Sequence, residues 1–439
     1  MAAVAAAIVG DALKRLIIDE VVELTRLMVG VPSPSGEERP LAHLVAEWGR
    51  AHAPHVNWRV DDVGAPAANV HGEAGRGERM SVALLSHLDT SLTGRGSEDE
   101  PVTGRADEPP AFRFHEGHGV LSGFGVGVAK APAAAAAVTF GAATAALDAA
   151  DVSYRLGLLL AAGGTHRARA GHAGSTTFAT GVRHALDCGW RPAAVVNAKC
   201  GPPGVLFEEP GALYLAIDVQ GRFSAASRPE AAAPPGGMAA RVGVVLDAID
   251  SWRTAYLARQ AAGRGQIRRE VAIGAIQTGS PAKPDLLPGR LSVSLYVVVG
   301  LDDEPAEVAG ELQRAVQRAL DNDRWPAKVR VSSYGFIAAG TTDPRSRLVE
   351  VAELAYRNAG GTPTRADPWR GSTDGALLRA RGIDTVRIGP RMTTPADDPR
   401  REEVSLAELA LAARAWLEIV VRMVVAEAGS YRAATRSEQ

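Results

Sequence analysis

Five side chains in this sequence are of types that could do acid–base or nucleophilic chemistry. His87 and Asp89 lie two residues apart at the end of an apolar run. Because alternate residues of a strand face the same side, their side chains can meet, and a histidine oriented by an aspartate is a competent general base. Lys199 and Cys200 follow a second apolar run, where a thiol beside a lysine could ionise to a nucleophilic thiolate. His166 follows a third apolar run.

These residues need strands that deliver them to one place. The apolar runs at 82–85, 154–162 and 193–197 predict buried strands, and the Ala-rich segment 131–150 predicts a helix packed closely on them. Strands that alternate with helices indicate an α/β domain with a mostly parallel sheet. Open sheets of this kind place ligands at the carboxyl ends of their strands. The polar residues named above come directly after the predicted strands and so lie at these ends.

The pattern of the chain changes near residue 211. Strands are predicted at 212–220, 271–277, 291–299 and 328–333, and helices at 238–260 and 305–320. The order β-α-β-β-α-β predicts a ferredoxin-like α+β domain inserted into the catalytic-type α/β domain. We expect the catalytic-type domain to span 1–209 and 335–439, and the inserted lid or dimerisation domain to span 210–334.

Composition narrows the class of protein. A chain of 439 residues with 46% hydrophobic residues can form two cores. The formal net charge of -2 gives no reason to expect nucleic acid or a membrane as a partner, so a small-molecule or peptide-like ligand fits better. Two cysteines make no disulfide framework, the N-terminus lacks a basic region before its apolar run, and no segment is a convincing membrane span. A cytoplasmic location is expected.

Further motifs follow one another along the chain. His87-Leu-Asp89 is succeeded by the glycine and lysine pattern of 123–131, and later by 371–375 and 382–390. Together these motifs resemble the M20 peptidase family, the aminoacylase- and carboxypeptidase-type dimetal hydrolases, over nearly the whole chain. The resemblance implies a two-domain fold and a homodimer formed through the inserted domain. It also implies that the ligand contacts Ser372, Thr373, Asp374 and Gly375.

Several positions that carry the chemistry of that family differ here. Val128 stands where the family has the aspartate that bridges two metals, and Thr165 and His166 stand where it has a catalytic and a ligating glutamate. Lys199 falls near another acidic ligand, and Ala225 replaces a histidine that reaches across the dimer. Valine has no lone pair and an ammonium repels cations, so we expect the dimetal site to be lost. Lys199 is interpreted as a surrogate for the metal, or as a lysine extending out of a loop.

Two later segments have acidic residues at family positions. Asp285 lies in 279–288, which resembles the segment that binds the substrate carboxylate, at a position where the family commonly has asparagine. The last histidine ligand is missing from 393–406, where Asp397 or Asp398 could substitute for it. These two aspartates could equally cap the helix that follows.

Three functions are compatible with these residues. The first is a metal-independent enzyme or binding protein for an amino-acid or peptide-like amide ligand, with a biosynthetic role as one option and no cofactor. Its candidate catalytic residues are His87, Asp89, Lys199, His166 and Cys200, although Cys200 is more simply a small buried apolar residue and His166 a loop residue. The second is a non-catalytic pseudo-hydrolase subunit. The third is a hydrolase with one zinc ion on His87, His166 and Asp398.

Overall fold

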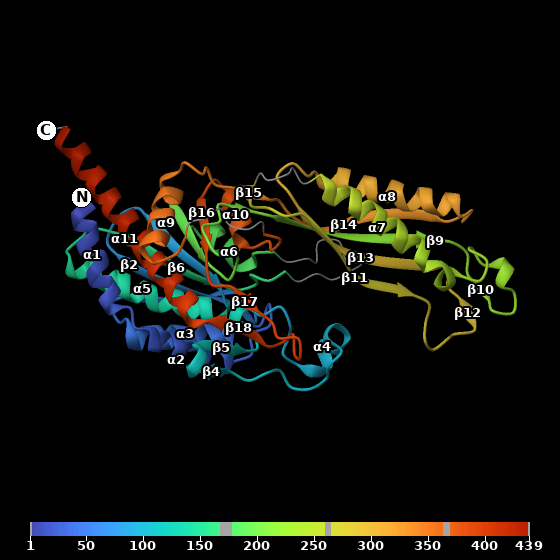
Figure 1. Ribbon diagram of the computed structural model, residues 1–439, viewed down its shortest axis with the longest axis horizontal. Helices are drawn as coiled ribbons and strands as arrows, with labels where there is room; N and C mark the ends of the chain where they lie inside the picture. Colours follow the sequence, from blue (N-terminus) through green and yellow to red (C-terminus); the bar gives the residue numbers. More distant parts are fainter. Residues whose placement is uncertain (1, 167–177, 260–264, 363–368, 438–439) are drawn as a thin grey trace.

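The computed structural model describes residues 2–166, 178–259, 265–362 and 369–437, the last with side chains as far as residue 428. Two parts, each built around its own sheet, lie end to end along the long axis (Figure 1). Both chain termini lie in the larger part, at the end remote from the smaller one. The chain therefore leaves the larger part, builds the smaller one and returns.

The larger part contains a six-stranded sheet in the order β1-β2-β6-β3-β7-β16. Its strands are β1 (Asn57–Gly64), β2 (Ala67–Gly75), β3 (Val82–His87), β6 (Arg155–Ala161), β7 (Ala194–Ala198) and β16 (Asp384–Ile388). The four strands from β6 to β16 are parallel, whereas β1 and β2 form an antiparallel hairpin at one edge. The predicted mostly parallel α/β sheet is confirmed, but the hairpin was not predicted.

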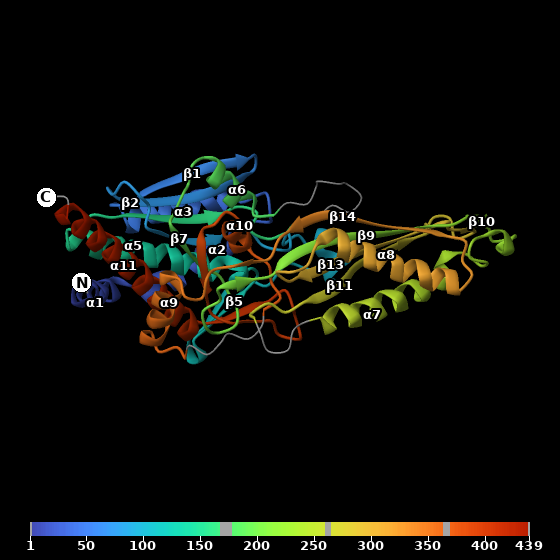
Figure 2. The same cartoon turned by 90° about the horizontal axis from the view of Figure 1, so that it is seen from above.

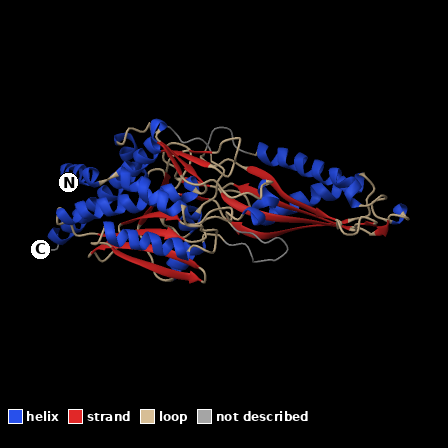
Figure 3. Ribbon diagram, turned by 90° about the horizontal axis from the view of Figure 1, so that it is seen from below, coloured by secondary structure: helices blue, strands red, loops and turns tan. Residues whose placement is uncertain are grey.

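Helices cover both faces of this sheet (Figure 3). One face packs against α3 (Arg39–His52), α5 (Ala131–Ala149), α9 (Arg347–Asn358) and α11 (Leu406–Ser437), and α1 (Ala2–Arg15) and α2 (Ile18–Val29) pack in turn against α5. The other face packs against α6 (Thr180–Asp187) and α10 (Asp374–Ala380). Because side chains alternate along a strand, Leu84 lies in the first core and Leu85 in the second. His87 therefore shares the face of Leu85.

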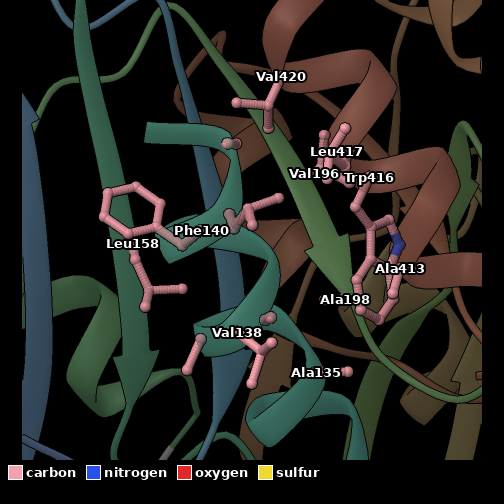
Figure 4. Close-up of a cluster of buried hydrophobic side chains, with 14 of the residues drawn as sticks. Ala135, Val138, Phe140, Leu158, Val196, Ala198, Ala413, Trp416, Leu417 and Val420 are labelled. Atoms are coloured by element: carbon pink, nitrogen blue, oxygen red, sulfur yellow. The ribbon is translucent and has the colours of Figure 1, made fainter. Parts of the chain in front are cut away.

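Helix α5 is buried on nearly all sides. Val138 and Phe140 pack between Leu158 of the sheet and the side chains of α11 around Trp416 (Figure 4). Among the described residues, the segment Val126–Ala149 is the one helical stretch long and apolar enough to cross a membrane, yet 89% of its apolar window is buried inside the protein. It is a core helix, which explains its apolar composition on every face.

The smaller part has the β-α-β-β-α-β order that the sequence predicted. Its elements are β9 (Gly211–Gln220), α7 (Val242–Ala258), β11 (Glu270–Thr278), β13 (Arg290–Val299), α8 (Pro305–Asn322) and β14 (Lys328–Ile337). The sheet order β11-β13-β9-β14 is fully antiparallel, and α7 and α8 cover one face with a separate apolar core (Figure 2). The ferredoxin-like topology is confirmed.

Short elements surround the junction between the two parts. The two crossings pair as β8 (Glu208–Glu209) and β15 (Gly340–Thr341). A small sheet of β4 (Arg113–His115), β5 (Val120–Gly123), β17 (Met392–Thr393) and β18 (Glu402–Ser405) lies beside α4 (Gly96–Thr103) in the larger part. At the opposite end of the smaller part, β10 (Ser224–Ala225) pairs with β12 (Leu286–Leu287).

Candidate functional site

A cleft lies at the carboxyl ends of the parallel strands, between the two sheets. Its volume is about 560 Å³, and its walls include Lys199 after β7 and the loop Gly164–His166 after β6. Tyr214 and Tyr296 of the smaller part close the other side. The predicted position of the ligand site at the sheet edge therefore coincides with an actual cavity.

His87 and Asp89 form a buried pair beneath this cleft. Nδ1 of His87 lies 3.0 Å from Oδ1 of Asp89, and both residues are fully buried. The amides of Gly164 and Thr165 donate to the same carboxylate at 2.7 and 2.8 Å, and the hydroxyl of Thr165 donates to it as well. Burial raises the pKa of Asp89, but His87 and these hydrogen bonds outweigh burial and the net pKa is lowered. Asp89 is therefore an anion that orients the imidazole.

The histidine is held neutral. Burial lowers the pKa of His87, and the charge of Lys199 lowers it further. With Nδ1 donating to Asp89, Nε2 is left as an acceptor, and it has no hydrogen-bond partner among the described residues. The pair is thus prepared to take a proton at Nε2, although this atom lies behind the cleft surface rather than on it.

Lys199 supplies a cation to the cleft. The side chain is buried, lines the cavity and makes no hydrogen bond or ion pair within the described part of the chain. Burial lowers the pKa of Lys199, while the nearby carboxylate of Asp374 acts in the opposite direction. A carboxylate in the cleft would favour the charged form of Lys199 in the same way that Asp374 does.

Asp374 begins α10 behind the cleft. Its Oδ1 atom is buried without a partner, and burial together with Asp89 raises its pKa to about 7, against the opposing effect of Lys199. Thr373 is the N-cap of this helix and its hydroxyl accepts from the Gly375 amide. Ser372 and Thr373 line the cavity, whereas Asp374 lies beneath it. Of the predicted ligand-contacting residues, two are thus on the cleft surface.

His166 and Cys200 both line the cavity, but neither has the character of an activated group. The His166 ring stacks edge-on against Phe178 at 4.7 Å, and burial lowers its pKa to about 3. Burial raises the pKa of Cys200 to about 12, so its sulfur stays a thiol. The predicted thiolate is not supported, because desolvation of the buried thiol outweighs the nearby positive charge of Lys199.

Asp285 and Asp398 do not reach this cleft in the described chain. Asp285 is exposed beside β12, at the far end of the smaller part, because the antiparallel register carries that hairpin away from Tyr214. Asp398 forms an ion pair with Arg400 at 2.9 Å and lines a separate cavity with Arg105. The zinc set of His87, His166 and Asp398 is therefore not assembled, because arginines already hold the aspartate.

The donor groups around the cleft do not fit two divalent cations. Val128 lies at the cavity wall with no lone pair to offer, and its amide donates to Glu402 at 2.9 Å. Lys199 brings a positive charge to the same space. Across the described residues, no group of three or more histidine, cysteine, aspartate or glutamate side chains is arranged to hold a metal ion. We therefore derive no chemistry from a bound metal.

Some residues of the site carry no sequence signal that we recognised. Arg387 lines the cleft with its guanidinium carbon 4.6 Å from the centre of the Trp369 ring. Glu209 is fully buried beneath it and binds Arg379 at 2.5 Å. The position of Arg387 at the end of a parallel strand is the one signal that could have identified it. No such sequence signal marks Glu209, because an acidic residue in a segment that connects two domains is ordinarily exposed to solvent.

Comparison with known proteins gives a consistent fold. No protein family and no curated protein matches the sequence. Among solved structures, a tripeptidase from Staphylococcus aureus superposes with a TM-score of 0.66 at 13% identity, covering 93% of this chain and 99% of that one. An M20 family metallo-carboxypeptidase from Sulfolobus solfataricus gives a TM-score of 0.62 at 13% identity, covering 93% and 100% of the two chains.

A dinuclear metal-binding M20 peptidase from Bacillus subtilis gives a TM-score of 0.57 at 13% identity, covering 93% of this chain and 98% of that one. These neighbours share both parts of the molecule, because nearly the full length of each chain is covered. The similarity is one of architecture, since identities this low establish the fold and leave function to the site. The chain has the two-domain fold of the M20 family peptidases.

Proposed function

We propose that the protein binds a carboxylate-bearing amino-acid or peptide-like ligand in this cleft without a metal ion, with Lys199 supplying the positive charge. The observation that carries the proposal is the side chain of Lys199, which is 8% exposed, lines the cavity and has no hydrogen bond or ion pair among the described residues. A ligand carboxylate would complete its hydrogen bonds and neutralise it.

Other unsatisfied groups around the cleft support a missing ligand. Among the described residues, buried polar atoms near the cleft without partners include Nε2 of His87, Oγ of Ser372, Oδ1 of Asp374 and Nε of Arg387. Each such atom costs about 1–3 kcal/mol when left unpaired. Their position at or just behind the walls of one cavity supports a polar ligand there.

The peptide-like nature of the ligand rests on the neighbouring folds, which include a tripeptidase and a human carnosine dipeptidase. If the bound ligand is turned over, the candidate base is the neutral imidazole of His87, which Asp89 orients behind the cleft wall. A His87→Ala variant separates the two possibilities. If the wild type turns the ligand over and His87→Ala binds it without turnover, the protein is an enzyme that uses His87. If the wild type itself binds the ligand without turnover, the protein is a pseudo-hydrolase subunit.

The test is a calorimetric titration of chelator-treated protein with N-acetyl amino acids and dipeptides. A charged hydrogen bond contributes about 1.5–3 kcal/mol, so Lys199→Met should weaken the best ligand about 10- to 100-fold. Lys130→Met is the matched control, because Lys130 is also buried but donates to the Val31 carbonyl at 2.8 Å away from the cavity lining. Equal affinity in wild type and Lys199→Met would refute the proposal.

A homodimer formed through the smaller part is also proposed. The edge strand β11 exposes Ile273 and Ile276, and β14 exposes Phe336, which is apolar surface that a second copy could cover. Light scattering that gives a monomer mass at micromolar concentration would count against the dimer.

We also propose a cytoplasmic location and the domain limits 1–209, 210–334 and 335–439.

A further inference from the structure

The charged residues that line the cleft are of one sign. Its described lining contains Lys199, Arg387, Arg391 and the neutral His166, and no aspartate or glutamate. The carboxylates of Asp89 and Asp374 are buried behind this surface. A ligand that enters the cleft therefore meets cationic side chains first, at more than one position.

Contacts fix the orientation of Arg387, but some of its N–H groups have no hydrogen-bond partner among the described residues. One amino group donates to the Cys200 carbonyl, and the guanidinium stacks on Trp369. Its Nη1 atom forms a long ion pair of 3.7 Å with Oε1 of Glu209, which already accepts from the Thr373 hydroxyl, while Arg379 binds the other oxygen at 2.5 Å. Both Nε and Nη1 of Arg387 are consequently buried without a hydrogen-bond partner among the described residues.

The stacking partner is itself fixed by both parts of the molecule. The indole of Trp369 donates to the Gly371 carbonyl at 2.6 Å, and its backbone amide donates to Gln266 at 2.7 Å. Gln266 leads into β11 of the smaller part and is fully buried. The plane of the guanidinium is thereby oriented before a ligand arrives, which lowers the entropy cost of binding a planar carboxylate.

Arg387 lies in β16, and Lys199 directly follows the neighbouring strand β7. In the parallel pairing of β7 with β16, Arg387 is opposite Asn197, and Lys199 follows two residues later. Side chains two residues apart face the same side. Strand spacing and rise place the two Cα atoms about 8 Å apart. Both side chains line the same cleft, which therefore presents two cationic groups to one ligand.

We propose that the cleft selects an acidic ligand with two carboxylates, one bound by Lys199 and the second by Arg387 stacked on Trp369. The substrate class is an acidic amino-acid derivative or a peptide that ends in an acidic residue. This inference rests on the proposed function, since Lys199 provides the first carboxylate site, and it adds Arg387 as the residue that determines specificity.

The test compares N-acetyl-L-glutamate with N-acetyl-L-glutamine, which differ by one carboxylate. Calorimetry on chelator-treated wild-type protein should show the acid binding about 10- to 100-fold more tightly. Arg387→Gln should abolish this preference by weakening the acid more than the amide. Arg387→Lys should restore part of the preference, because it keeps the charge but loses the planar fork.

Arg400→Gln is the matched control. Arg400 is also a buried arginine, but it pairs with Asp107 and Asp398 away from the cleft, so its loss should leave the preference intact. Equal affinity of the wild type for both compounds overturns the inference without needing any variant to fold. If both compounds bind equally and Lys199→Met weakens both, the proposed function survives and this inference fails. If Lys199→Met weakens neither, the proposed function fails.

Discussion

The buried carboxylate of Asp89 makes the substitution Asp89→Asn informative. Four donors converge on this side chain: two amides at 2.7 and 2.8 Å, the Thr165 hydroxyl, and Nδ1 of His87 at 3.0 Å. An asparagine of the same size offers one carbonyl oxygen and turns an NH₂ group toward the remaining donors. At least one backbone amide then loses its acceptor, which predicts a loss of at least about 1–3 kcal/mol in the free energy of unfolding.

The assay is urea unfolding at pH 7 followed by circular dichroism. The two sheets have separate cores, so two transitions are expected, and Asp89→Asn should lower the one that belongs to the larger part. Asp99→Asn is the matched control, since Asp99 is a buried carboxylate that accepts three hydrogen bonds from Thr93 and Gly94 outside the cleft. It should lose stability while retaining ligand affinity.

Ligand affinity completes this prediction. Asp89→Asn should also weaken binding, because the loop that carries Thr165 is fixed by Asp89 and forms part of the cavity wall. A stability change within about 0.5 kcal/mol of the wild type, a size typical of surface substitutions, would refute the hydrogen-bonding scheme. If Asp89→Asn lowers stability but leaves ligand affinity unchanged, the buried pair of His87 and Asp89 has no role in ligand binding.

Two further predictions concern buried titratable groups. The pKa of Asp374 is raised to about 7 in the folded protein from an ordinary value of 3.8, so its ionisation destabilises the fold progressively between those pH values. Asp374→Asn should therefore increase stability at pH 8 by up to about 4 kcal/mol and little at pH 4, and a pH-independent effect in thermal unfolding would contradict this. Because burial raises the pKa of Cys200 to about 12 while Cys188 is exposed, iodoacetamide at pH 8 should label Cys188 alone in the folded protein. Mass spectrometry showing comparable labelling of Cys200 would disprove its described environment.

The sequence was informative where local pattern determines structure. Strands such as β3 were predicted from short apolar runs, and the smaller part from the alternation of its elements. The hairpin of β1 and β2 escaped prediction because residues such as Asp61 and Asp62 interrupt its apolar pattern. Such an edge hairpin is stabilised by pairing with β6 rather than by its own composition.

The site was only partly accessible to sequence reasoning. The distance between His87 and Asp89 follows from the two-residue period of a strand, so their contact could be anticipated. The stacking of Arg387 on Trp369 depends on tertiary packing between segments distant from any motif. Likewise, the burial that keeps Cys200 a thiol is a property of the folded environment, and the sequence alone does not reveal it.

The most direct test of the account is the metal dependence of ligand binding. N-acetyl-L-glutamate is titrated into wild-type protein as purified, after chelator treatment, and after addition of one or two equivalents of zinc, with metal content measured by elemental analysis. The account predicts the same affinity in all three states, because Lys199 provides the cation and Val128 offers no ligand. Binding that appears only when zinc is present at one or more equivalents would contradict it.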